Sequence, residues 1–124
     1  MPQIDPFALA SDTVVRDTDR IAALKDILLE VEDDPALAPK AADLASKIVL
    51  NRSDDLLVRQ HAAQEVALYP RPSLANELTS VLCDAGDDID LRVNLLDAFQ
   101  QWNHPLLAKL TNLLDQDDPL KPYL

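Results

Sequence analysis

Glycine is almost absent from this chain of 124 residues, which contains one glycine, Gly86, and one cysteine, Cys83. Tight β-hairpin turns use glycine because it adopts positive φ angles without steric cost, so the composition argues against an all-β fold. A single cysteine excludes an internal disulfide and indicates a reducing compartment. Aromatic residues make up only 4 % of the chain, which is few for a site that encloses a chromophore.

Basic residues are also scarce, because 11 lysines and arginines stand against 22 aspartates and glutamates, giving a formal net charge of −11. Binding to nucleic acid or to an anionic membrane depends on basic side chains that neutralise phosphate, so neither is an expected partner. A basic protein surface fits the charge better, although the same charge also keeps a small domain in solution. No apolar run approaches the length of a transmembrane helix, and the first residues do not resemble a signal peptide. The expected location is the cytoplasm.

Leucine and alanine dominate the chain, and nine prolines interrupt it. Apolar residues recur at helical spacing in separate stretches, and prolines and capping residues stand between these stretches. The predicted helices cover residues 19–32, 35–50, 55–68, 73–84, 89–102 and 105–115. Because the connections are short, consecutive helices are expected to pack as antiparallel hairpins. The sequence therefore predicts an all-α fold.

Two stretches of the chain repeat each other, one beginning at Asp54 and the other at Asp87. They read DDLLVRQHAAQEVALYP and DDIDLRVNLLDAFQQWN, and each has two acids, an aliphatic–arginine pair and a final aromatic residue. The arginines of the two pairs are Arg59 and Arg92. The two stretches begin 33 residues apart. Repetition at this distance is typical of stacked helical hairpins. Residues 19–50 have the length of a hairpin but no arginine at that register, which favours a divergent terminal unit.

The pattern D-D-x-x-V-R-x-x-A-A-x-x-V-A, followed by a proline turn and L-A-x-x-L-x-x-V-L, resembles a HEAT repeat of the short bacterial kind. The resemblance covers residues 54–118 well and residues 19–50 loosely. It departs from the family at the turns inside the hairpins, where Tyr69-Pro70 and Trp102-Asn103 replace the usual glycine. The resemblance implies an α-solenoid, a fold whose members mostly bind proteins, although a few have enzymatic or chaperone roles.

The expected organisation is a single HEAT-like domain of about three antiparallel hairpins over residues 19–118. Residues 1–18 are expected to form an N-terminal segment or lid, and residues 119–124 a C-terminal tail. The apolar side chains of these terminal segments alternatively serve as docking elements or dimer contacts, so a monomer and a weak homodimer both remain open. The resemblance implies that Arg59 and Arg92 reach an acid of the neighbouring repeat and set the stacking; the alternative is that they bind a carboxylate of a partner.

No catalytic, metal-binding or cofactor-binding site is expected. A zinc site needs paired histidines or cysteines at ligand spacing, and His61 and His104 have no such partners nearby in the sequence. The acidic run at residues 84–90 does not follow the spacing of a calcium-binding loop, so its acids and Gly86 are expected to end and cap helices. The chain is therefore expected to be non-enzymatic.

The expected binding surface combines an acidic edge, formed by the loops between hairpins, with the second helices of the hairpins, which line the concave side of such stacks. The second predicted helix contributes the polar stripe of Lys40, Asp43 and Lys47. The candidate partner-binding residues are Asp84, Asp87, Asp88, Asp90, Asn76, Glu77, Ser80, Lys109 and Asn112. The same residue types also occur on any solvent-exposed helix, and the sequence leaves that alternative open.

These features together predict a module that binds a protein partner with a basic surface. The small size and high acidity suit an inhibitor of the immunity or antitoxin kind, because complementary charge speeds association and penalises wrong partners. One alternative is a lyase-type or maturation helper for cofactor attachment, with Tyr69 and Trp102 bordering a cleft. The other alternative is a structural scaffold.

Overall fold

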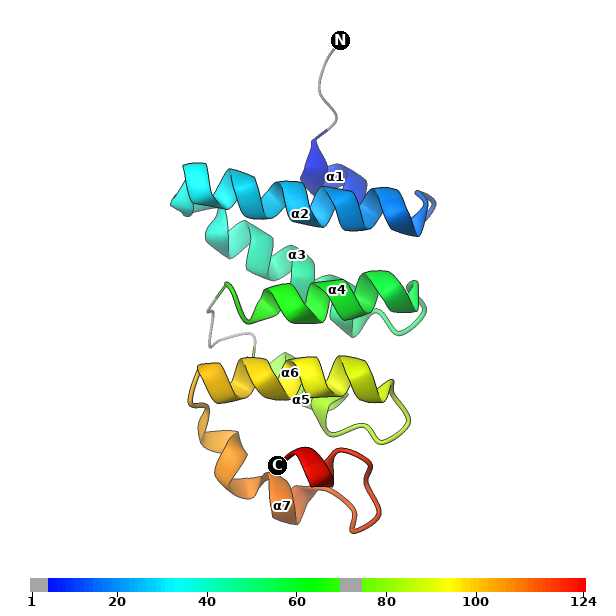
Figure 1. Ribbon diagram of the computed structural model, residues 1–124, viewed down its shortest axis with the longest axis vertical. Coiled ribbons are helices and arrows are strands. Elements are labelled where there is room, and N and C mark those ends of the chain that lie inside the picture. Colours follow the sequence, from blue (N-terminus) through cyan, green and yellow to red (C-terminus); the bar gives the residue numbers. More distant parts are fainter. Residues whose placement is uncertain (1–4, 70–74) are drawn as a thin grey trace.

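The computed structural model describes residues 5–69 and 75–124 (Figure 1). Over these two ranges the protein is all-α, with seven α-helices and no strand, as the sequence predicts. The α-helices are α1 (Pro6–Ser11), α2 (Asp17–Asp33), α3 (Ala38–Leu50), α4 (Leu56–Val66), α5 (Ala75–Leu82), α6 (Ile89–Gln101) and α7 (Leu110–Leu113). Short 3-10 helices lie at η1 (Pro35–Leu37), η3 (Pro105–Lys109) and η4 (Lys121–Tyr123).

The sixth predicted helix, residues 105–115, is wrong in type over its first five residues. Residues 105–109 form the 3-10 helix η3, and only Leu110–Leu113 are α-helical. In η3 the first bond runs from Leu107 N–H to the His104 carbonyl, three residues back. Apolar spacing over such a short stretch does not separate three residues per turn from 3.6. The predicted start of the fourth helix at residue 73 and the turn residue Pro70 lie outside the described residues.

The N-terminal segment contains a helix, α1, that the sequence pattern did not reveal. Asp5 is its N-cap and accepts a hydrogen bond from the Phe7 N–H at 3.0 Å, and Pro6 occupies its first position. An acid followed by proline is a favourable helix start, because the carboxylate satisfies a free N–H and proline has none to satisfy. Phe7 and Ala10 are buried against the rest of the protein. Residues 6–11 are therefore part of the packed fold.

The helices lie in two rows. Helices α2, α4 and α6 lie across one side of the molecule in successive layers, while α1, α3 and α5 lie on the other side (Figure 1). Neighbouring helices of one row contact each other: α2 with α4, α4 with α6, α1 with α3, and α3 with α5. The two rows pack together through the pairs α1 and α2, α3 and α4, and α5 and α6. The core lies between the rows. Its most deeply buried apolar side chains include Leu24, Ile27, Leu78, Leu82, Leu91, Leu95 and Phe99.

The turn after α6 forms without the glycine that similar repeats have there. Asn103 has a φ of 51°, in the left-handed region that glycine usually occupies. Asparagine tolerates this region better than most residues. The next residue, His104, donates its N–H back to the Phe99 carbonyl at 3.0 Å and so closes the end of the helix. Asparagine thus takes over the helix-ending role.

Three buried arginines connect the layers. Arg20, Arg59 and Arg92 each stand four residues after the N-cap of their helix, in α2, α4 and α6, and their exposed fractions are 1, 4 and 0 %. Each donates its Nε–H to a backbone carbonyl ten residues earlier, at the end of the preceding helix of the other row. The accepting carbonyls belong to Ala10, Val49 and Leu82, at 2.9, 3.2 and 3.0 Å.

The remaining guanidinium nitrogens of each arginine bind both carboxylate oxygens of an aspartate in the next loop along the stack. The pairs are Arg20–Asp54, Arg59–Asp87 and Arg92–Asp118, with N···O distances between 2.5 and 2.9 Å. The hydrogen bonds from the arginine hold the pKa of each of these aspartates below its usual value, although burial opposes the shift. We call each set of carbonyl, arginine and aspartate an arginine clamp. One clamp joins three segments that are far apart in the sequence.

Replacing Asp87 by alanine is expected to lower the free energy of unfolding by about 3–5 kcal/mol, because the change leaves the Arg59 guanidinium buried without its counter-charge. Equilibrium urea denaturation at pH 7 measures the loss. The matched control is Asp90→Ala, at an exposed acid in the first turn of α6, where a loss below about 1 kcal/mol is expected. Equal losses in the two variants would contradict a stabilising role for the clamp.

Candidate functional site

The predicted acidic edge exists as a row of loops, which lie together on the right-hand side of Figure 1. Most of its acids are occupied by bonds within the protein. Asp87 has a side chain 5 % exposed and gives both oxygens to Arg59. Asp88 caps α6 by accepting the Leu91 N–H, and it also accepts a hydrogen bond from the Gln60 side chain at 2.9 Å. These two aspartates therefore stabilise the fold, and a role for them in binding remains a prediction.

The other two candidate acids of this edge are more accessible. Asp84 accepts the Gly86 N–H at 2.9 Å and forms a 3.4 Å ion pair with Arg52, and Asp90 is exposed. Arg52 also donates to the Ser80 carbonyl at 3.2 Å. Because its side chain is 49 % exposed, its ion pairs contribute little energy. Arg52 nevertheless links the loop before α4 to the loop before α6.

Arg20 is the clamp arginine that the repeat pattern did not reveal. The repeat was recognised by the distance from Arg59 to Arg92, and Arg20 stands further from Arg59 than that because α2 has 17 residues whereas α4 has 11. In the structure, arginine stands four residues after the N-cap in all three helices. The sequence analysis placed the start of this helix at residue 19, whereas α2 begins at Asp17, so counting from the predicted helix starts did not align Arg20 with the other two arginines.

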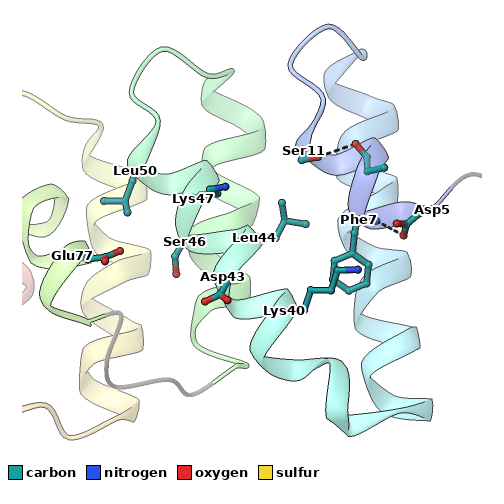
Figure 2. A pocket seen from close by; sticks show the side chains of 11 residues that line it. Asp5, Phe7, Ser11, Lys40, Asp43, Leu44, Ser46, Lys47, Leu50 and Glu77 are labelled. Atoms are coloured by element: carbon teal, nitrogen blue, oxygen red, sulfur yellow. Dashed lines mark hydrogen bonds between the residues drawn. The ribbon is translucent and has the colours of Figure 1, made fainter.

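A groove of about 630 Å³ crosses the other row of helices (Figure 2). Helix α3 runs through it and supplies six lining residues, from Lys40 to Leu50; α1 and its N-cap form one wall and α5 the other. The groove includes the whole predicted polar stripe of Lys40, Asp43 and Lys47. A smaller hollow of about 350 Å³ adjoins it and shares three of its lining residues. Both hollows lie on the row formed by α1, α3 and α5 or at its edge.

The α1 side of the groove is largely apolar. Phe7, Ala8 and Leu44 line it, and Phe7 is anchored in the core with 7 % exposure. The Lys40 ammonium lies 4.2 Å from the centre of the Phe7 ring, which is within the range of a cation–π interaction. Figure 2 shows the lysine side chain extending to the ring. Lys40 is therefore partly held by α1.

The α5 side of the groove is polar. Glu77 extends from α5 toward α3, where Ser46 and Leu50 line the same groove (Figure 2). Ser46 is 2 % exposed, and its Oγ has no hydrogen-bond partner among the residues that the structure describes. A buried hydroxyl without a partner costs free energy, and in a native structure it calls for an explanation. A ligand group in the groove would supply that partner.

Of the other predicted concave residues, none lines this groove. Asn76 and Ser80 are exposed on α5, and the Ser80 hydroxyl donates to the Glu77 carbonyl at 2.9 Å. Lys109 and Asn112 are exposed in the last helical layer. The structure thus brings Glu77 together with the α3 stripe and leaves the remaining candidates outside.

Nucleophilic or metal chemistry finds little support in the side chains that the structure describes. Within residues 5–69 and 75–124 no three histidine, cysteine or acidic side chains are grouped to hold a metal ion. Burial raises the pKa of the Cys83 thiol, which keeps it protonated and poorly reactive near neutral pH. The His104 Nδ1 accepts the Leu106 N–H, and its ring packs on Phe99 with centroids 5.0 Å apart.

The aromatic pair expected beside a cofactor cleft lies away from the groove. Tyr69 is buried, and Trp102 is half-buried with its ring 5.6 Å from that of Phe99. The Tyr69 hydroxyl and the Trp102 Nε1 both lack hydrogen-bond partners. Neither residue lines the groove of Figure 2.

Glu65 is a buried acid without a matching base. It is 5 % exposed and its Oε2 has no hydrogen-bond partner. Burial raises its pKa to about 8, an effect that the charge of Lys25 on α2 only partly offsets. The side chain is therefore mostly protonated at neutral pH and becomes a buried charge when it ionises.

Comparison of the chain with protein-family models, with curated proteins and with solved structures gives no match in any of the three. The resemblance to HEAT repeats therefore rests on the motif in this sequence. Of the helices formed by the described residues, none is long and apolar enough to cross a membrane.

Stability is expected to fall as the pH rises from about 4.5 to about 8, because over this window folded Glu65 keeps the proton that unfolded Glu65 has lost. The clamp aspartates act in the opposite direction, since their lowered pKa values stabilise the fold above about 3.8 and that contribution is lost in stronger acid.

Glu65→Gln is expected to be about neutral at pH 5 and to stabilise at pH 9 by about 3–5 kcal/mol. Urea denaturation at both pH values measures the difference. If the variant and the native protein have equal free energies of unfolding at pH 5 and at pH 9, Glu65 ionises in the folded protein as it does in water.

Proposed function

We propose that this protein is an α-solenoid module of HEAT-like helical repeats and that its groove over α1, α3 and α5 binds a segment of another protein. The groove is the observation that carries the proposal. Its volume of about 630 Å³ is within the range of binding sites, about 300–1,000 Å³. Its lining of apolar surface with charges of both signs suits a polypeptide, which offers side chains of each kind.

The arginine clamps support the repeat part of the proposal. In each of three layers an arginine at the same helical position joins the end of the preceding helix to the next loop. Recurrence of one side-chain arrangement in successive layers is what a repeat array of stacked units requires. The second helices of such units line the concave side, and here α1, α3 and α5 correspond to them.

The groove is a better candidate surface than the acidic edge alone. Asp87 and Asp88 already have partners inside the protein, so a ligand would compete with the fold for them. The net charge of −11 still favours a basic partner through long-range attraction. A non-enzymatic inhibitor of such a partner, of the immunity or antitoxin kind, is the form of the proposal that fits both features.

Filling the groove is expected to weaken binding. A library of random linear peptides displayed on phage is selected on the intact protein, and the binders are tested against Ala8→Tyr, which places a ring in the groove at an exposed residue of α1. A loss of affinity of about tenfold or more is expected from the lost contact area. The matched control is Ala22→Tyr, at an exposed alanine of α2 outside the groove. Binders that tolerate both changes equally would contradict the proposal.

A further inference from the structure

The two sides of the groove differ in chemistry, and this difference restricts what fits there. On the α1 side, Phe7 and Leu44 present apolar surface, and a cation already lies near the Phe7 ring because Lys40 occupies that position. A second cation placed there would meet like-charge repulsion. An aliphatic or aromatic side chain of a partner meets no such repulsion, and burying it against Leu44 and the exposed edge of Phe7 is favourable.

On the α5 side, the lining contains carboxylates and a hydroxyl. Glu77 is exposed and contributes a carboxylate, and the Ser46 Oγ is buried and lacks a partner. Asp43 adds a second carboxylate to the lining, one turn before Ser46 on α3. A guanidinium or ammonium group donates several N–H bonds, so it can satisfy a carboxylate and a hydroxyl at the same time. The Glu77 carboxylate only accepts, whereas the Ser46 hydroxyl accepts or donates, so a donor with more than one N–H is the group that satisfies both.

Charge over a longer range agrees with this assignment. The groove lining has three carboxylates, from Asp5, Asp43 and Glu77, against two ammonium groups, and one of these two is held at the Phe7 ring. The whole chain carries −11. An acidic segment would approach against this field, whereas a basic segment is drawn in.

We infer that the occupant is a segment of a partner protein in which a basic residue, bound by Glu77 and Ser46, stands close to an apolar residue bound by Phe7 and Leu44. The inference rests on the proposed function, because it names the partner for the same groove. It assigns the basic side chain to the α5 side and the apolar side chain to the α1 side. Lys47, which also lines the groove, opposes the basic side chain and limits its affinity.

The test uses the peptides whose binding depends on Ala8, and their basic residues are replaced by citrulline, which has nearly the shape of arginine but no charge. Arginine or lysine beside an apolar residue is expected in these peptides. Citrulline is expected to weaken binding to the native protein by about tenfold or more, as for a charge-assisted hydrogen bond. Against Glu77→Gln the same replacement is expected to have little effect, because the charge partner is already gone. Asp97→Asn, at an exposed acid of α6 outside the groove, is the control for general charge.

Two further variants are expected to change the affinity for the arginine peptide in opposite directions. Ser46→Ala removes the hydroxyl without adding bulk to a buried site and is expected to weaken the arginine peptide severalfold. Lys47→Gln is expected to strengthen it severalfold, because an exposed like charge is removed. Circular dichroism and urea denaturation establish that all variants remain folded.

The outcomes separate the two proposals. Two results would show that the occupant has no basic residue at Glu77 while leaving the groove as a binding site. The first is that the groove-dependent peptides are acidic or uncharged. The second is that citrulline weakens binding equally in the native protein and in Glu77→Gln. A weaker complex with Lys47→Gln also overturns the assignment of a basic residue, because it shows that the lysine attracts the occupant. If no selected peptide depends on Ala8, both the groove and its assignment fail.

Discussion

A guanidinium group removed from water must have its hydrogen bonds satisfied and its charge balanced, and this protein meets that requirement three times. Arg20, Arg59 and Arg92 are almost fully buried, and each binds a carbonyl behind it and a carboxylate ahead of it. Each clamp therefore fixes a helix of one row against the end of a helix of the other row and against the next loop. The spacing of the layers depends on these contacts as much as on the apolar core between them.

The clamps also explain why the excess of acid is less available to a partner than the composition suggests. Asp54, Asp87 and Asp118 are used to balance buried arginines, while Asp55 and Asp88 cap helices. The loop edge is thus built largely from bonds within the protein. On the row formed by α1, α3 and α5, the groove combines apolar surface, charges of both signs and a hydroxyl without a partner among the described residues. For this reason we propose that the partner binds on the face with the groove and not on the loop edge.

The sequence predicted the all-α class and the approximate positions of the helices from α2 to α6, because apolar periodicity and capping are local properties of the chain. It did not reveal α1, which is too short to show a period, nor the 3-10 geometry of residues 105–109. Glu77 and the α3 stripe were recognised as polar surface, and the structure brings them into one groove. Ser46 escaped notice because a serine inside a helix gives no sign of whether its hydroxyl has a partner.

What the sequence by itself determined is local: that the chain is all-α, roughly where the helices from α2 to α6 lie, and that the chain is acidic and rich in apolar side chains. What only the tertiary structure decided is pairing over distance. Each clamp joins an arginine to an aspartate 26 to 34 residues away, and the groove joins Phe7 to Glu77 across three helices. The position of an aspartate in the sequence does not show whether it will cap a helix, balance a buried arginine or face solvent. That choice depends on which groups lose their water when the layers pack together.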